Sequence, residues 1–460
     1  MVIEDRYIDR DYMEDHSVFY SRSFYSFENW CRRVHFFSIS KKDVRAKLSA
    51  LVEIGLDRGE DAYREACRKF SEEAYLGFTV IKPLKGCPVG RTVLRALESD
   101  SGDDSQLTFE STRLYKAHLA GVELTVRGLA FQQQDVGVSA CATTALWTAL
   151  QKVRDFEDIR LATPAQITML ASQYTLPFGR PMPSEGLSID QMCQAVQSLG
   201  LPPHLFKVKD FDTARAHLHS ALMSGFAPVL ILLRGSSYHA VTAVGVEMRI
   251  ESDSALIIEG IDDRAKELAA VYIHDDRNGP YLRASLTRNI DNLELEIELD
   301  NSQGAERWTL THILIPMHLK IRLSFVGLRA IAINIVKSIQ SYRESYLEAS
   351  VAHLDIQNST IAFDTQIRLS NMYVEQLFLS REKLPLNKVN EFLKKISLAR
   401  YIGLVRLNSS FFGGVDVLVD TTSTLRNLNF LGIISRSDKT KYTRDILNFL
   451  ADKLECDVVL

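Results

Sequence analysis

Near residue 226 the spacing of the apolar residues changes from helical to extended, and this change determines the fold class. Helix-like stretches precede this point, at residues 41–55, 59–76 and 141–150. Strand-like stretches follow it, at residues 228–233, 239–246, 268–273 and 308–316. Helices followed by a run of strands are typical of an α+β fold, in which the helices pack on one side of a sheet. We therefore expect an α+β protein.

The length of the chain predicts more than one domain, because its 460 residues exceed the roughly 100–200 that one domain usually holds. The first part is rich in aromatic residues between Tyr7 and Trp30, which a disordered segment would lack. We expect a helical, aromatic-rich N-terminal extension over residues 1–80, a central domain over 81–319 and an α+β accessory domain over 320–460.

Charge and composition exclude several classes of protein. The net charge is −4 and the pI is near 6.3, so no basic field favours nucleic acid as a partner. No uncharged apolar run reaches the roughly 18–20 residues of a membrane helix, and the acidic start is unlike a signal peptide. The six cysteines are scattered without C-x-x-C spacing, which predicts neither a disulfide framework nor a thiolate zinc site. We expect a cytoplasmic protein with reduced thiols, no cofactor, no metal, and no binding to nucleic acid or membrane.

Three residues of the central domain fit one catalytic mechanism. Cys141 stands at the start of a predicted buried helix with Ser139 as its N-cap. A helix N-terminus lowers the pKa of a thiol and offers backbone N–H groups to an anion. His239 opens a predicted strand, and Asp275 ends the next one at a turn. The thiol would be the nucleophile, the imidazole would carry the proton, and the carboxylate would orient the imidazole. Upstream, Gln134 could donate its amide to a developing oxyanion.

The order of these residues resembles that of papain-like cysteine peptidases, and the details are most similar to the C39-type, bacteriocin-processing group. The resemblance covers about residues 120–318 and rests on Gln134, Cys141, Gly186-Leu187-Ser188, the stretch 226–229, His239-Ala240-Val241 and the turn 275–279. It implies that the central domain is a papain-like core, with a Cys-bearing helix packed on an antiparallel sheet. It also implies a triad of Cys141, His239 and Asp275, with Gln134 at the oxyanion site.

Two assignments within this site stay open at the level of the sequence. Gln134 lies one residue further from Cys141 than in the papain pattern, so Gln133, Gln134 and Asp135 all compete for the oxyanion role. Asp276 follows Asp275 directly, so either carboxylate could orient the histidine. A metal site at His274, Asp275 and Asp276 is disfavoured, because adjacent strand residues point to opposite faces.

The expected function is that of a cysteine-nucleophile amide hydrolase, a peptidase that acts on a protein or peptide through a thioester. A deamidase or a transglutaminase would use the same triad. One alternative is a catalytically degenerate papain-like scaffold that acts as a protein-interaction module, with a protein partner bound through the C-terminal domain. Another is a latent enzyme whose groove is covered by the N-terminal residues 1–40, so that their deletion raises the reactivity of Cys141.

Overall fold

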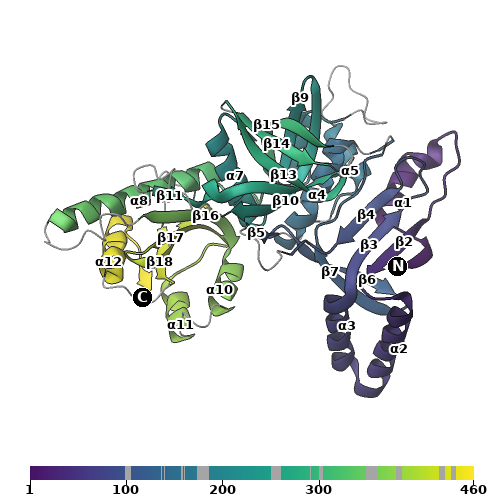
Figure 1. Ribbon diagram of the computed structural model, residues 1–460, viewed down its shortest axis with the longest axis horizontal. Coiled ribbons are helices and arrows are strands. Elements are labelled where there is room, and N and C mark those ends of the chain that lie inside the picture. Colours follow the sequence, from purple (N-terminus) through teal and green to yellow (C-terminus); the bar gives the residue numbers. More distant parts are fainter. Residues whose placement is uncertain are drawn as a thin grey trace. The chain divides into compact units, whose positions relative to one another are not determined.

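The computed structural model of the chain is α+β and divides into two compact units (Figure 1). It describes residues 1–98, 105–135, 137–138, 140–156, 159, 161–173, 186–249, 261–290, 292–299, 304–348, 360–379, 386–423, 430–436 and 442–459. Unit 1 consists of residues 1–208, 225–247 and 270–317, and unit 2 of residues 209–224, 248–269 and 318–460. The predicted α+β class and the prediction of more than one domain therefore agree with the structure. Within the described part of the chain, no helix has the length and apolar character needed to cross a bilayer.

Unit 1 begins with a four-stranded sheet in the order β1-β2-β3-β4 (Figure 1). Its strands are β1 (Val2–Tyr7), β2 (Cys31–Phe37), β3 (Tyr75–Ile81) and β4 (Val89–Leu94). The helical elements between them are α1 (Arg10–Val18), the 3-10 turn η1 (Tyr20–Arg22), α2 (Lys41–Arg58) and α3 (Glu60–Ala74). The hairpin of α2 and α3 confirms the two helices expected there.

The N-terminal region is not the helical extension that the sequence predicted. The expected boundary at residue 80 falls inside β3, and β1, β2 and β3 all lie before it. The charges of β2 hide its alternating pattern, because Arg33 faces inward and is only 8% exposed. Its guanidinium pairs with Glu4 at 2.5 Å and lies 4.1 Å from the ring centroid of Tyr7. Arg33 is therefore buried, whereas Arg32 beside it is exposed.

The centre of unit 1 combines a buried helix with a closed ring of strands. Its helices are α4 (Cys141–Phe156), α5 (Pro164–Ala171) and α6 (Ile189–Ser198). The strands β9 (Val229–Arg234), β10 (Ser237–Arg249), β12 (Leu268–Asp275), β13 (Gly279–Asn289), β14 (Asn292–Glu298) and β15 (Ala305–Pro316) pair in the order β12-β13-β14-β15-β9-β10. An additional pairing of β12 with β10 closes this ring. Helix α4 packs on β9 and β15. The remaining strands of unit 1 are β5 (Ser105–Thr108), β6 (Arg113–Leu119), β7 (Val122–Gly128) and β8 (Pro203–Lys207).

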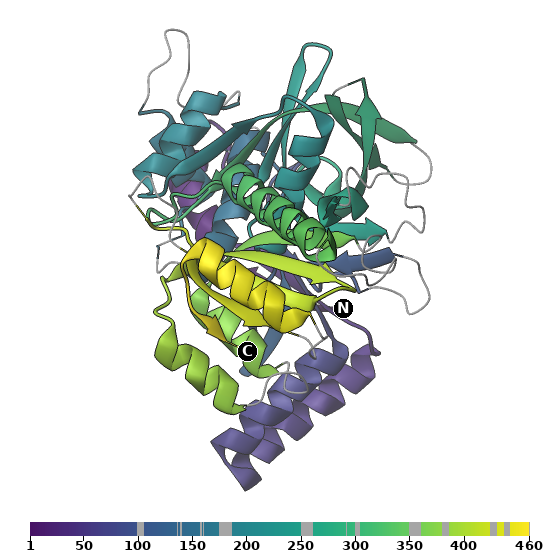
Figure 2. The ribbon, with the colours of Figure 1, turned by 90° about the vertical axis from the view of Figure 1, so that its left-hand side faces the viewer.

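Unit 2 is a sheet in the order β11-β16-β17-β18-β19-β20 with helices on both faces. Its strands are β11 (Ile261–Asp263), β16 (Ile361–Leu369), β17 (Tyr401–Ser409), β18 (Gly413–Asp420), β19 (Phe430–Ser435) and β20 (Val458–Val459). Its helical elements are α7 (Phe211–Met223), η2 (Arg264–Glu267), α8 (Phe325–Glu348), α10 (Ser370–Leu379), α11 (Leu386–Lys395) and α12 (Thr443–Leu454). Helices α8 and α12 lie side by side, with the rings of Tyr342 and Phe449 stacked at 4.3 Å (Figure 2). Helices α10 and α11 pack on the sheet through a separate apolar cluster.

The last segment of unit 2 begins at residue 318, next to the border predicted at 319/320. Two earlier segments also belong to unit 2, and the predicted central domain over 81–319 includes both of them. One supplies α7 and the other supplies β11, which pairs in parallel with β16 from Ile261 opposite Ile361. The sequence of a short helix or a short strand does not indicate which sheet it joins. The assignment of these two segments to unit 2 was therefore not visible in the sequence.

Candidate active site

Cys141 is the first residue of α4, as the sequence predicted. The helix is already hydrogen-bonded there, since the N–H of Thr144 donates to the carbonyl of Ala140 at 3.0 Å. Small and apolar residues bury the helix behind the cysteine, and the side chain of Cys141 itself is partly exposed. Backbone N–H groups at the start of a helix have no partner within the helix and can bind an anion. The predicted N-cap, Ser139, lies outside the described residues.

His239 and Asp275 come together because β10 and β12 are paired neighbours in the ring of strands. The Nε2 atom of His239 lies 2.9 Å from Oδ1 of Asp275. The histidine is 2% exposed and the aspartate 1%. A buried hydrogen bond between a histidine and a carboxylate fixes both the ring orientation and the tautomer.

Asp275 and Asp276 differ sharply in their contacts. The carboxylate of Asp275 also accepts hydrogen bonds from the backbone N–H of Arg277 at 3.0 Å and from the side-chain amide of Asn278 at 2.9 Å. Asp276 approaches Nε2 of His239 only to 3.8 Å, and its buried carboxylate has no hydrogen-bond partner among the described residues. In this geometry Asp275 is the carboxylate that orients His239.

The second ring nitrogen of His239, Nδ1, is the one left for Cys141. The thiol lies close enough to help raise the pKa of His239, but Nδ1 has no hydrogen bond of standard geometry within the described residues. A hydrogen bond connects α4, which carries Cys141, to β10, which carries His239. The hydroxyl of Thr242 on β10 donates to the carbonyl of Ala145 on α4 at 2.8 Å. Catalytic hydrogen bonds are often long before a substrate binds.

The surroundings of His239 favour its charged form. Burial alone would lower the pKa of His239, but the hydrogen bond to Asp275, the nearby thiol of Cys141 and the charges of Asp275 and Asp276 raise it to about 9. For Asp275, burial is outweighed by the hydrogen bond and charge of His239, so the pKa of Asp275 is lowered. For Asp276 burial prevails and raises the pKa to about 6. The site is therefore built to hold an imidazolium against an ionised Asp275.

The three candidates for the oxyanion site differ in how their side chains are engaged. The Oε1 atom of Gln133 accepts a hydrogen bond from the backbone N–H of Val89 at 3.3 Å. Asp135 is a buried acceptor whose Oδ1 binds two backbone N–H groups of the following loop. Gln134 is half buried, and its amide has no hydrogen bond to a described residue. Asp135 thus offers no donor, and Gln134 differs from Gln133 in that no described residue holds its side-chain amide.

Two neighbours of the site were not singled out from the sequence. The ring of Trp308 lies 5.6 Å from the ring of His239, is 4% exposed, and so limits the access of water to the His239–Asp275 hydrogen bond. Its sequence signal was only that of a strand residue. Asn278 anchors Asp275, and its position in the turn that follows β12 could have suggested this role.

His239, Asp275 and Asp276 could also hold a divalent cation. One ligand atom from each lies within 4.8 Å of the other two, and all three residues are buried. A cation on Nε2 of His239 would replace the hydrogen bond to Asp275, so the two arrangements exclude each other. His274, which the sequence analysis weighed as a metal ligand, packs instead against Phe131 and Tyr281, with ring centroids 5.8 and 4.7 Å away.

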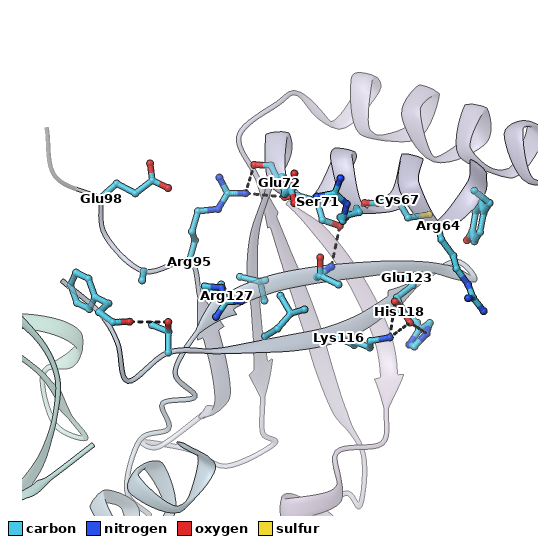
Figure 3. Close-up of a pocket in the computed structure, with 18 of the residues that line it drawn as sticks. Arg64, Cys67, Ser71, Glu72, Arg95, Glu98, Lys116, His118, Glu123 and Arg127 are labelled. Atoms are coloured by element: carbon cyan, nitrogen blue, oxygen red, sulfur yellow. Dashed lines mark hydrogen bonds and ion pairs between the residues drawn. The ribbon is translucent and has the colours of Figure 1, made fainter. Parts of the chain in front are cut away.

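A cavity of about 1320 Å³ lies elsewhere in unit 1, between α3 and the β6–β7 hairpin (Figure 3). Among the described residues, its lining includes no member of the Cys–His–Asp group. Its charges largely neutralise one another, as in the pair of Lys116 and Glu123 at 3.0 Å. Burial raises the pKa of the cysteine on its wall, Cys67. Among the described lining residues, the one cysteine is therefore a weak nucleophile.

No protein-family model matches the chain, and no curated protein matches it either.

Proposed function

We propose that the protein is a cysteine-nucleophile amide hydrolase, a peptidase that works through Cys141, His239 and Asp275. The observation that carries the proposal is the buried contact of 2.9 Å between His239 and Asp275, beside the cysteine that begins α4. This contact occupies Nε2 and directs Nδ1 to the thiol. A nucleophile, a base and an orienting carboxylate in series are the requirement for acyl transfer.

The reaction would proceed through a thioester. Nδ1 of His239 takes the proton of the Cys141 thiol, the sulfur attacks the amide carbonyl to form the S–C bond, and the π electrons of the carbonyl move onto its oxygen. The backbone N–H of Cys141 and the amide of Gln134 would stabilise this oxyanion. His239 then gives its proton to the leaving nitrogen as the C–N bond breaks. Water, deprotonated by His239, attacks the thioester, and the C–S bond breaks to release the acid as His239 returns its proton to the sulfur and restores the thiol.

The architecture around the site supports a papain-like core as part of the same proposal. A helix that begins with the cysteine packs on a closed ring of strands, and two paired strands of that ring carry the histidine and the aspartate. The substrate would be a protein or a peptide. A deamidase or a transglutaminase would form the same thioester and differ in the amide attacked or in the acceptor.

A second candidate is a scaffold that binds proteins without catalysis. The absence of a standard hydrogen bond to Nδ1 of His239 within the described residues favours it, because an inactive core no longer needs that contact. Unit 2, with its own sheet and helices, would then provide the surface for a protein partner.

One experiment separates the two functions without a known substrate. The full-length protein is alkylated with iodoacetamide between pH 5 and 9, in EDTA, and each of the six cysteines is followed by peptide mass. We expect Cys141 to react fastest already at pH 6–7, and His239→Ala to remove this advantage. Cys31 is an internal control, because burial raises its pKa to about 12 and should keep it slow. Slow labelling of Cys141 that is indifferent to His239 would refute the enzyme and leave the scaffold.

A further inference from the structure

In the described part of the loop between Gln134 and Cys141, one buried carboxylate binds two backbone N–H groups, and the hydroxyl of Thr168 donates to the carbonyl of Val138 at 2.9 Å. Oδ1 of Asp135 accepts hydrogen bonds from the backbone N–H groups of Gly137 at 3.0 Å and Val138 at 2.7 Å. Asp135 itself is 5% exposed. Two charge-assisted hydrogen bonds from one carboxylate fix the backbone of this loop. Asp135 therefore sets the spacing between the proposed oxyanion donor and the nucleophile.

The second oxygen of Asp135 faces an equally buried cation. Nζ of Lys82 lies 3.6 Å from Oδ2, and the two side chains are 3% and 1% exposed. The charge of Asp135 also acts on the nearby hydroxyl of Tyr20 and adds to the effect of burial in raising the pKa of Tyr20. The carboxylate is thus fixed from two elements, the end of β3 and the N-terminal segment.

The N-terminal segment, residues 9–20, is itself locked onto the elements around the site. Oδ2 of Asp11 accepts a hydrogen bond from the indole N–H of Trp147 on α4 at 3.1 Å and pairs with Arg91 at 2.7 Å. Oδ1 of Asp15 accepts from the backbone N–H of Ala165 in α5 at 3.2 Å. Acidic residues on α1 therefore bind both the helix that carries Cys141 and the helix that follows it.

The aromatic end of this segment covers the loop directly. A Cβ atom on Gly137 would lie 2.5 Å from a ring carbon of Phe19 and 3.2 Å from the hydroxyl of Tyr20, so only glycine fits there. The two aromatic residues thus close over the backbone that Asp135 organises. The aromatic residues at the end of the N-terminal segment therefore support the loop that precedes the nucleophile.

We propose that Asp135 is a positioning residue for the acyl-transfer reaction, and that the N-terminal segment acts as a clamp that holds it. This inference rests on the proposed function. When the thiolate adds to a carbonyl, the oxyanion must meet the backbone N–H of Cys141 and the amide of Gln134, which lie on either side of the loop. A loop released by loss of the clamp would misplace these donors but leave the thiol and His239 in contact. Loss of the clamp would then lower acylation, the opposite of what latency requires.

The test compares two reactions of Cys141 in the full-length protein. Alkylation by iodoacetamide forms no oxyanion, whereas acylation by p-nitrophenyl acetate does, so the ratio of the two rates reports the oxyanion site alone. Asp135→Ala should lower acylation by about tenfold or more, in line with the loss of oxyanion stabilisation, while alkylation changes by less than about twofold. Asp135→Asn keeps an acceptor for both N–H groups and should recover part of the lost acylation rate. Tyr20→Phe should lower the acylation rate less than Asp135→Ala does.

A matched control is Asp210→Ala. Asp210 accepts a backbone hydrogen bond from Thr213 at 2.8 Å as the N-cap of α7, so its loss removes a comparable contact without touching the loop. We expect the ratio of acylation to alkylation in Asp210→Ala to match that of the wild type. An unchanged ratio in folded Asp135→Ala would overturn the inference, and if that variant does not fold, unchanged ratios in Asp135→Asn and Tyr20→Phe would do so. Wild-type alkylation that does not depend on His239 would instead refute the proposed function itself.

Discussion

Replacing Asp275 with asparagine should lower the pKa of His239 markedly from its value of about 9, toward the ordinary 6.5. Asp275 supplies the largest contribution that opposes burial, and without its charge the burial of His239 favours the neutral ring. The difference between 9 and 6.5 corresponds to about 3 kcal/mol of interaction between the imidazolium and its surroundings. Asp276→Asn is the matched control, because its carboxylate is 3.8 Å away and makes no hydrogen bond to the ring.

The assay is a histidine titration by NMR between pH 5 and 10, with the His239 signal assigned from its absence in His239→Gln. We expect a midpoint near pH 9 in the wild type, a large fall in Asp275→Asn and a small one in Asp276→Asn. A midpoint that stays near 9 in Asp275→Asn would show that the carboxylate does not hold the charge. A larger effect in Asp276→Asn would exchange the roles of the two aspartates.

The same ion pair makes a prediction for stability. Because the pKa of His239 is higher in the folded state than the ordinary 6.5, its contribution is fully present below pH 6.5 and is lost as the pH rises through about 9. Urea unfolding at pH 6 and pH 9.5 should show a drop, up to about 3 kcal/mol of which comes from this group, and a smaller drop in Asp275→Asn. Equal drops in both proteins would contradict this account.

Two further predictions concern contacts that hold the site together. Thr242→Val removes the hydrogen bond to the carbonyl of Ala145 and should cost about 1 kcal/mol in urea unfolding, with slower alkylation of Cys141 at pH 7; unaltered alkylation would mean that this tie does not set the register of the two elements. Trp147→Phe leaves the buried carboxylate of Asp11 without its indole donor and should cost about 1–3 kcal/mol, measured in the same way. A cost near zero there would show that Arg91 alone satisfies Asp11.

The parts of the fold that the sequence revealed are those with a clear period and a clear boundary. Helix α4 begins at Cys141, where the sequence predicted the start of a buried helix. Strands β9 and β10 read as apolar runs because both are buried. The sheet β1–β4 was missed because its inward-facing positions include charged and polar residues, such as Arg33 and His35, that are satisfied by Glu4. A search for alternating apolar residues does not detect a strand whose inward-facing side chains are charged or polar.

The sequence predicted which residues form the candidate site, but not which aspartate contacts the histidine or which side chain covers it. The order of Cys141, His239 and Asp275 along the chain sufficed to group them, because each falls at the end of a predicted element. The choice of Asp275 over Asp276 depends on a difference between 2.9 and 3.8 Å, which no spacing rule resolves. The position of Trp308 beside His239 depends on the pairing of β15 with β9, a long-range contact that leaves no local signal.

The course of the chain between the two units limits how such a protein could have arisen and how it can be dissected. The sequence alternates between unit 1 and unit 2 in six consecutive segments, so five junctions join them. A domain appended to the end of a gene would leave one junction, and a domain inserted as a block would leave two. A cut at the border between residues 319 and 320 would separate β11 from β16, its partner in the sheet. No single break of the backbone, whether by a protease or by a stop codon, yields either unit whole, and recombination between related genes would preserve both only where it exchanged them together.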